Sequence, residues 1–227
     1  MAAATHNTML DQIGQTQAAL PTSLVVLLGL AVFAVIMLPT WLLVQHVTTM
    51  AHEGAHALVG WAFGGKVKSV TMQPDGSGLT TTSFTRSAGH LMSVFAGYIG
   101  PSAFGLAAAK LISIGHIVAV LWLVLLLLAA LLITVRNFFA LCVVVVTGFL
   151  LYLSARYASV AMQTVVAYVI TWFLLLSGLR HVLLYSRQEG DDASQAAEKT
   201  HLPSWLWVGV WQLGAAVALV VGAKLLL

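Results

Sequence analysis

Charged side chains are scarce in this sequence, and their scarcity excludes a soluble globular protein. Of 227 residues, ten are Lys or Arg and seven are Asp or Glu, together 7% of the chain. A typical soluble domain has roughly 25% charged residues. Hydrophobic residues make up 60% of the chain. So few charges cannot cover the surface of a soluble domain of this size, and we therefore predict a polytopic membrane protein.

Basic clusters and paired cysteines are also missing. The net charge of +3 comes from scattered residues and from no Lys/Arg patch, which argues against nucleic acid as a partner. Cys142 is the single cysteine, so no disulfide can form within the chain. The polar N-terminal tail 1–21 has no Lys or Arg, whereas a secretory signal begins with basic residues. We therefore expect the first apolar run to be kept as a membrane helix.

Apolar runs of the length that membrane helices need, about 17–25 residues, account for most of the chain. They cover residues 22–38, 40–63, 88–113, 115–135, 137–155, 158–180 and 204–226. Pro39 divides the first two runs, and proline ends or kinks a helix. We expect two spans joined by a tight turn there, which makes seven helices. One long kinked helix, and so six in all, is the alternative. Residues 22–227 are expected to form a single all-α integral-membrane domain.

Two polar segments interrupt these runs. In the first, two Thr- and Val-bearing stretches flank the turn Pro74-Asp75-Gly76, which predicts a small β-hairpin over 66–85. The second, 185–203, is expected to be a polar loop with one or two helical turns over 192–200.

Basic residues are distributed unequally between the two sides that these spans define. The hairpin side collects seven: Lys66, Lys68, Arg86, Arg136, Arg180, Arg187 and Lys199. The opposite side collects three: Lys110, Arg156 and Lys224. The positive-inside tendency then predicts that the hairpin side faces the cytoplasm. With seven helices, the N-terminus would lie on that side too.

The second apolar run contains the motif HExxH, as His52-Glu53-Gly54-Ala55-His56. Residues four apart lie on one helix face, so His52 and His56 are placed to bind one Zn²⁺. Glu53 is then placed to act as the general base on a zinc-activated water. Ionisable residues inside a membrane helix are costly and indicate a functional site. The motif therefore predicts a catalytic zinc centre, with Glu53 as catalytic residue.

Further segments accompany the motif and are similar to one protein family. They are Gly64-Gly65-Lys66, Asp75-Gly76-Ser77-Gly78-Leu79-Thr80, Ala96-Gly97-Tyr98-Ile99-Gly100-Pro101-Ser102, Arg136-Asn137, Asp192-Ala193 and Thr200-His201-Leu202-Pro203. With HExxH, they make most of the chain after residue 22 resemble the site-2-protease-type intramembrane zinc metallopeptidases, in particular the small bacterial subgroup without a PDZ domain. HExxH is the specific element of this resemblance, and the other segments are individually weak.

The resemblance does not carry over directly to the third zinc ligand. In the larger members of that family, this ligand is an Asp from an Asp-Gly motif on a later membrane helix. The only Asp-Gly here is Asp75-Gly76, in the predicted hairpin turn. The polar loop of the small subgroup implies Asp192 instead, and that loop lies on the same predicted side as the hairpin. Alternatives remain open: Asp191, Asp75, His181, His201 or a missing ligand.

The resemblance implies hydrolysis of peptide bonds in membrane-embedded proteins, known as regulated intramembrane proteolysis. Its partners would be a single-pass or membrane-tethered regulator and the lipid bilayer, and its place a bacterial inner or plasma membrane. The free edge of the hairpin is expected to take up substrate as an added β-strand. The alternative is a non-proteolytic membrane protein, such as a metal-binding transporter or a pseudoprotease scaffold. The intact Glu53 argues against both, because neither needs a general base.

Overall fold

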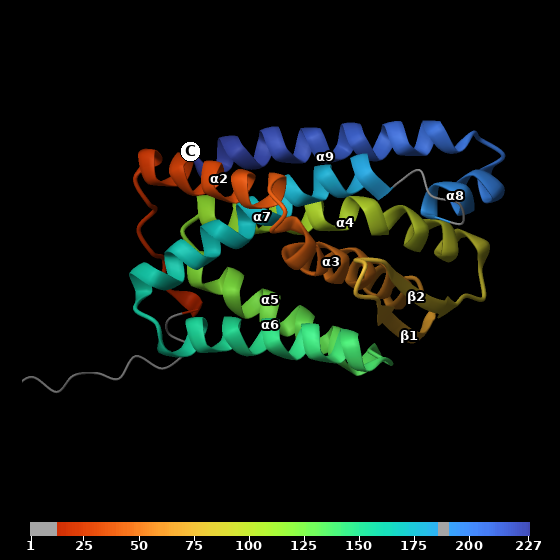
Figure 1. Ribbon diagram of the computed structural model, residues 1–227, viewed down its shortest axis with the longest axis horizontal. Helices are drawn as coiled ribbons and strands as arrows, with labels where there is room; N and C mark the ends of the chain where they lie inside the picture. Colours follow the sequence, from red (N-terminus) through yellow and green to blue (C-terminus); the bar gives the residue numbers. More distant parts are fainter. Residues whose placement is uncertain (1–12, 186–190) are drawn as a thin grey trace, which may run out of the picture.

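The computed structural model describes residues 13–185 and 191–227. These form a bundle of membrane-length helices with one β-hairpin (Figure 1). The elements are α2 (Thr22–Met37), α3 (Trp41–Ala62), β1 (Lys66–Met72), β2 (Gly78–Ser83), α4 (Ser87–Ser113), α5 (Ile117–Thr134), α6 (Phe138–Tyr157), α7 (Val160–Tyr185), α8 (Asp192–Thr200) and α9 (Ser204–Leu226). Residues 1–12 of the predicted tail and 186–190 of the predicted polar loop, including Arg187, lie outside the described residues.

The helices confirm an all-α polytopic membrane protein. Five of them, α4, α5, α6, α7 and α9, are long and apolar enough to cross a membrane. Helical spans are expected in lipid because a helix satisfies its own backbone hydrogen bonds there. The remaining pair, α2 and α3, is bent by 104° and passes the same test only as one broken span.

This bent pair corrects the expectation of two spans over 22–63. Helix α2 has 16 residues, which is short of the about 17–25 that a span needs. Leu38 has extended backbone torsions in front of Pro39, as the residue before a proline commonly does, and the helix ends there. The structure therefore supports five spans, or six, the alternative count, if the bent pair is one broken span, and it does not show seven.

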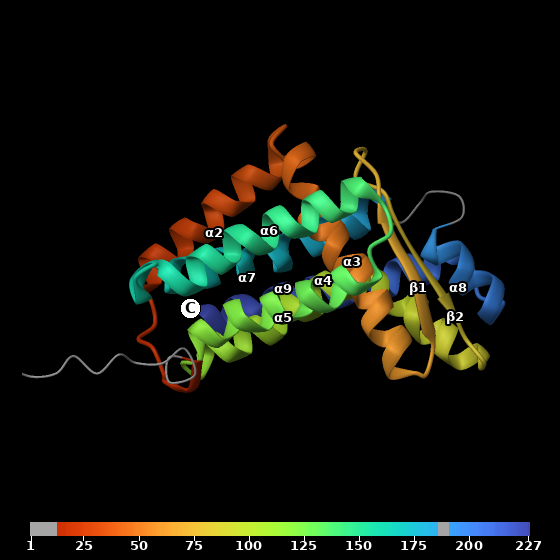
Figure 2. The same ribbon diagram turned by 90° about the horizontal axis from the view of Figure 1, so that it is seen from below.

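The residues before α2 lie at the end of the bundle opposite the hairpin. The Gln17 backbone N–H donates to the Gly115 carbonyl over 2.8 Å, in the turn between α4 and α5. The Thr22 hydroxyl lies 3.5 Å from the carbonyl of Leu227. The start of α2 and the end of α9 are therefore neighbours, while the hairpin and α8 lie at the other end (Figures 1 and 2). The seven-helix expectation, which placed the residues before α2 on the same side as the hairpin, is therefore not met by residues 13–21.

The predicted hairpin is confirmed, and one face of β1 holds it to the bundle. Val70 and Met72 of β1 are almost fully buried. They pack in one cluster with side chains of α3, α5, α6 and the α5–α6 turn: Met50, Ala57, Leu131, Val135, Ala140 and Val144. The hairpin is thus wedged between α3 and the α5–α6 pair, and it is not a free surface loop.

The outer edge of β1 is already occupied. The Arg136 backbone N–H donates to the Val70 carbonyl over 3.0 Å, and Val70 forms a parallel bridge with Val135. The Asn137 side chain accepts from the Met72 N–H at 3.2 Å and donates to the Met72 carbonyl at 2.7 Å. The backbone groups of Val70 and Met72 therefore point away from β2.

The outer edge of β2, by contrast, has no backbone hydrogen-bond partner among the described residues and is called open below. Val70 pairs with Thr80, and Met72 pairs with Gly78. In an antiparallel ladder, opposite residues point their N–H and C=O groups either both toward each other or both outward. Since Val70 and Met72 point theirs outward, Thr80 and Gly78 do too. Two residues of β2 thus present backbone hydrogen-bonding groups on the side away from β1.

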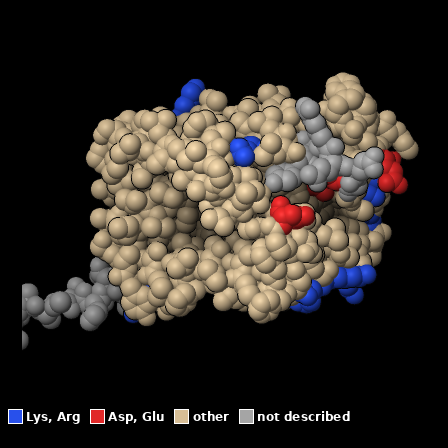
Figure 3. Space-filling view, viewed as in Figure 1, with Lys and Arg blue, Asp and Glu red and all other residues tan. Residues whose placement is uncertain are grey.

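Charge is distributed as a membrane protein requires. In the face seen in Figure 3, the acidic side chains lie toward the end that carries the hairpin and α8, and most of the remaining surface is uncharged. Large apolar side chains on the outer faces of the spans are exposed, among them Leu30, Leu43, Leu126 and Phe149. Such surfaces match the hydrocarbon of a bilayer.

Candidate metal centre

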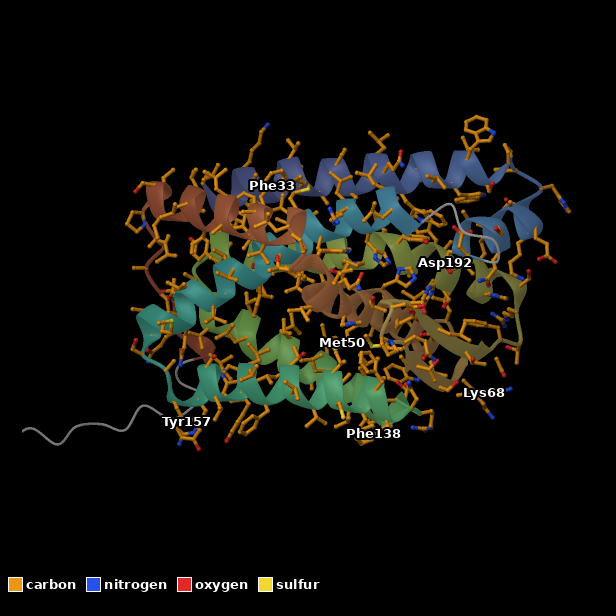
Figure 4. The ribbon with its side chains drawn as sticks, in the orientation of Figure 1. Phe33, Met50, Lys68, Phe138, Tyr157 and Asp192 are labelled. Atoms are coloured by element: carbon orange, nitrogen blue, oxygen red, sulfur yellow. The ribbon has the colours of Figure 1, made fainter. Side chains whose placement is uncertain are left out.

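Two imidazoles of α3 converge as their spacing predicts. His52 and His56 lie one helical turn apart, and their Nε2 atoms are 3.1 Å from each other. Both side chains are buried, with 8% of each residue exposed. Met50, two residues earlier, points to the other side of the helix, toward α5 and α6 (Figure 4). The helix thus presents an apolar face to β1, α5 and α6, and a ligand face to α4, α7 and α8.

The third group comes from α8. The Asp192 Oδ2 atom lies 3.3 Å from the His52 Nε2 atom and 3.1 Å from the His56 Nε2 atom. Figure 4 shows Asp192 at the hairpin end, where α8 meets the helices of the bundle. Within the described ranges, these three residues are the one group of His, Cys, Asp and Glu that could hold a metal ion. Asp192, the predicted third ligand, is therefore brought together with both histidines.

Local capping explains why Asp192 and not its neighbour reaches the site. Asp191 is the N-cap of α8, and its Oδ1 accepts from the Ser194 backbone N–H at 2.9 Å. This satisfies one of the free donors at a helix start. Asp192 is then the first residue of α8 and is 7% exposed. The cap turns the Asp191 carboxylate back onto α8 and leaves Asp192 to face the histidines.

The hydrogen bonds of His56 leave its Nε2 atom free to accept. Its Nδ1 atom lies 2.7 Å from the Ser93 carbonyl of α4, so Nδ1 carries the proton and donates. The Ser93 hydroxyl donates in return to the His56 carbonyl over 3.0 Å. A neutral imidazole with a proton on Nδ1 has only a lone pair on Nε2. That lone pair faces a second imidazole nitrogen and a carboxylate oxygen.

Such a convergence of electron pairs fits a bound cation. Two histidines and one carboxylate are a common set of protein ligands in catalytic zinc sites, which bind with bonds of about 2.0–2.2 Å and leave a fourth position open. Ligand atoms around a tetrahedral ion with such bonds are roughly 3.3–3.6 Å apart. The three separations of 3.1, 3.1 and 3.3 Å are close to this range. The donor set therefore fits a metal ion.

Electrostatics keep the Asp192 carboxyl in the form that binds metal. Burial by itself raises the pKa of this carboxyl, but the protonated imidazoles of His56 and His52 outweigh burial and hold the pKa well below its usual range. A metal ion bound in place of those protons would act on the carboxyl in the same direction. A carboxyl with a lowered pKa is ionised in the folded protein at neutral pH. Asp192 thus offers an anionic oxygen to the site.

Glu53 lies beside the ligand set and is held by the hairpin. The Thr80 hydroxyl donates to Glu53 Oε2 over 2.6 Å and lies 3.1 Å from the Glu53 carbonyl. Gly78 packs against the same carboxylate so closely that a Cβ atom at this position would overlap Glu53 Oε1. Only 3% of Glu53 is exposed. The general base predicted from the motif is therefore oriented by β2, which the motif alone did not reveal.

A cavity of about 260 Å³ connects these groups. It lies between α3, β2, the start of α4, α7 and α8. Its lining includes Thr49, His52, Glu53, His56, Ser77, Gly78, Thr80, Thr82, Phe84, His90, Ser93, Tyr98, His181, Asp192 and Gln195. The three ligand residues, the carboxylate of Glu53 and the open edge of β2 thus share one chamber.

Gly97 brings α4 against the ligand atoms. A Cβ atom at this position would overlap His56 Nε2 and Asp192 Oδ2. Gly97 lies in the segment Ala96–Ser102 that carried the family resemblance, where its specific contact could not be predicted. Ser93, which orients His56, has no recognisable signal in the sequence.

The other candidate ligands lie outside the metal group. Asp75 closes the hairpin turn, where the Ser77 hydroxyl and backbone N–H donate to it and lower the pKa of its carboxyl. His201 ends α8 with a left-handed backbone. The His181 ring lies 5.1 Å from the His52 ring and lines the cavity, but it does not belong to the three-residue group.

A buried two-histidine, one-carboxylate cluster with an adjacent glutamate defines a membrane protein with a metallopeptidase-like centre. The family described as peptidase M50B-like matches residues 24–222 of the sequence, and the chain belongs to that family. This confirms the site-2-protease-type resemblance. Comparison of the chain with curated proteins and with solved structures finds no match.

Proposed function

We propose that this protein is an intramembrane zinc metalloprotease that hydrolyses peptide bonds of membrane-embedded proteins. The observation that carries the proposal is that Glu53, the group His52, His56 and Asp192, and the open edge of β2 line one cavity. Family membership supports a metallopeptidase, and the helices make the protein a multi-pass membrane protein.

In this proposal, the ligands are His52 and His56 through Nε2 and Asp192 through Oδ2. A zinc ion held there would polarise the scissile carbonyl and acidify a water molecule. Glu53 takes a proton from that water as its oxygen forms the new bond to the carbonyl carbon. When the C–N bond breaks, Glu53 gives the proton to the leaving amine.

The open edge of β2 suggests how a substrate would be held. A peptide bond in a membrane helix is shielded by the hydrogen bonds of that helix, so the substrate segment must be extended before attack. Gly78 and Thr80 carry outward-facing backbone groups, and both residues contact Glu53. An extended segment added along this edge would exchange its helical bonds for strand bonds beside the general base.

Partners and location follow from this function as part of the proposal. The substrate would be a single-pass protein or a membrane-tethered regulator, and the surrounding medium a lipid bilayer. The resemblance to the small bacterial subgroup points to an inner or plasma membrane. The hairpin side, which collects most of the basic residues, would face the cytoplasm.

The test combines metal content with cleavage. We expect about one zinc per chain by elemental analysis of detergent-purified protein, and marked loss of zinc in His56→Ala and Asp192→Ala. Fluorescently labelled casein, an unfolded protein with extended segments, serves as the substrate probe. Glu53→Gln should keep its zinc and lose about 100- to 10,000-fold in cleavage rate, the range that general acid–base catalysis contributes.

The other outcomes have definite meanings. If His56→Ala loses zinc and Asp192→Ala does not, the protease hypothesis stands, but the third ligand is a residue other than Asp192. Zinc binding with equal cleavage in wild type and Glu53→Gln would refute the proposed mechanism. A wild type without zinc in metal-replete medium would refute the enzyme. A transporter or pseudoprotease is not favoured, because neither explains a glutamate held against the ligand group.

A further inference from the structure

The α5–α6 turn carries an asparagine that is used in an unusual way. Asn137 is the N-cap residue of α6, yet its side chain makes no capping hydrogen bond. Asparagine is among the preferred N-cap residues because its side chain satisfies a free donor at the helix start. Here the side chain points to β1 instead.

The Asn137 side-chain amide forms the hydrogen bonds that a neighbouring strand would form with the outer edge of β1. It accepts from the Met72 N–H at 3.2 Å and donates to the Met72 carbonyl at 2.7 Å. A primary amide has one acceptor and one donor group, as a backbone amide does. With the Arg136 N–H on the Val70 carbonyl at 3.0 Å, the turn forms hydrogen bonds along the outer edge of β1. This edge of the hairpin is therefore closed.

A short path of direct contacts leads from Asn137 to the general base. Met72 is the cross-strand partner of Gly78. Gly78 in turn lies against Glu53, with no space for a side chain between them. The two hydrogen bonds between Asn137 and Met72 thus lie directly across the hairpin from the part of β2 that borders the cavity.

We propose that Asn137 is a positioning residue, which closes the β1 edge and holds the β2 edge in register with Glu53 for strand addition. This inference rests on the proposed function, because it assumes that the substrate binds along β2. It predicts that substrate is admitted to one edge of the hairpin only. Asn137 touches neither the ligand group nor the substrate in this arrangement.

The test compares variants of two adjacent residues in the full-length protein. Asn137→Ala removes both side-chain hydrogen bonds to Met72. Asn137→Asp keeps the size of the side chain and the oxygen that accepts from the Met72 N–H, but it loses the N–H that donates to the Met72 carbonyl. Arg136→Ala is the matched control, because among the residues that the structure describes the Arg136 side chain bonds the nearby carbonyls of Ile133 and Val135 and no atom of the hairpin. Its backbone bond to Val70 is unaffected by the substitution.

Both Asn137 variants should raise KM for labelled casein about tenfold, as expected for the loss of one or two hydrogen bonds that position the edge. Their kcat should stay within about twofold of wild type, and their zinc content should be unchanged. Hydrogen exchange should become faster at the β1 amides, Met72 above all, because Asn137→Ala removes the acceptor of the Met72 N–H and the carboxylate of Asn137→Asp repels the Met72 carbonyl. Arg136→Ala should change neither KM nor exchange at Met72.

Wild-type KM and wild-type exchange in the Asn137 variants would overturn the inference. So would an equal loss of zinc or kcat in the Asn137 and Arg136 variants, because that would indicate a structural role of the turn as a whole. If Asn137→Ala does not accumulate, Asn137→Asp decides the matter. If wild type itself fails to cleave casein, the proposed protease fails, while exchange at Met72 still shows whether Asn137 holds the hairpin.

Discussion

At the scale of single residues, His56 shows how one side chain is prepared for metal binding by contacts on two helices. Its spacing from His52 comes from α3, but its ring orientation comes from the Ser93 carbonyl on α4. This bond selects the tautomer whose Nε2 atom has a free lone pair. Partners of this kind orient a ligand and are commonly as important as the ligand itself.

Gly97 provides a residue-scale prediction. Gly97→Ala should weaken zinc binding about 10- to 100-fold, the range typical of changes next to a ligand, because the added methyl group overlaps His56 and Asp192. Competition with a zinc chelator of known affinity measures this. Gly54→Ala is the control: it lies in the motif itself, and its added Cβ would meet nothing within 4 Å. Equal zinc affinity in both variants would contradict the close approach of α4.

At the scale of elements, the hairpin has two edges with different surroundings. The edge of β1 is bonded to the α5–α6 turn, and the edge of β2 borders the cavity. An exposed edge is a general liability, since any extended chain can pair with it. Here the open edge borders the same cavity as Glu53, the proposed general base, and the walls of that cavity restrict what can pair with the edge.

Two substitutions of Thr80 separate its side chain from its backbone. Thr80→Val removes the hydroxyl that donates to Glu53 but keeps the outward N–H, and should lower kcat about tenfold, as for a hydrogen bond to a charged group. Thr80→Pro removes both groups. Proline is tolerated where the N–H of an edge strand faces outward, so the hairpin should survive.

The additional effect of Thr80→Pro over Thr80→Val should appear mainly as a higher KM, with zinc content unchanged in both. Steady-state cleavage of labelled casein and elemental analysis measure these quantities. If the two variants behave alike, the substrate does not use the Thr80 N–H, and strand addition at this point of β2 is wrong.

At the scale of the whole molecule, the five long apolar helices and the bent α2–α3 pair, counted as one broken span, make an even number of six. The start of α2 and the end of α9 therefore lie at the same end of the bundle, joined by the Thr22–Leu227 contact. The break between α2 and α3 matters for the site, because it turns α3 across the bundle and carries the motif to the hairpin end (Figure 2).

Sidedness can be measured with single cysteines introduced after Cys142→Ala. Glu198→Cys on α8 should react with a membrane-impermeant reagent from the cytoplasmic side. Ser159→Cys in the α6–α7 turn and Ala19→Cys before α2 should react only from the opposite side. All three positions are exposed. Reaction of Ala19→Cys and Glu198→Cys from the same side would contradict six spans and would mean either seven spans or five with a re-entrant α2–α3 pair.

The sequence by itself determined those features that depend on neighbours in the chain. Scarce charge and long apolar runs sufficed for a membrane protein, because the bilayer acts on every residue of a span. HExxH sufficed to pair His52 with His56, since four residues make about one turn of a helix. The hairpin and the short helix over 192–200 were likewise predicted from local turn and loop signals.

Only the tertiary structure decided what depends on distant segments. Asp192 was one of several possible ligands until α8 was packed against α3 and α4, because no local pattern encodes a contact between remote helices. The number of spans depended on the angle between α2 and α3 at Pro39. The proline predicts that the helix breaks there, but it does not predict the angle of the bend. The closed and open edges of the hairpin depend on Asn137, whose amide would serve equally well as an ordinary helix cap.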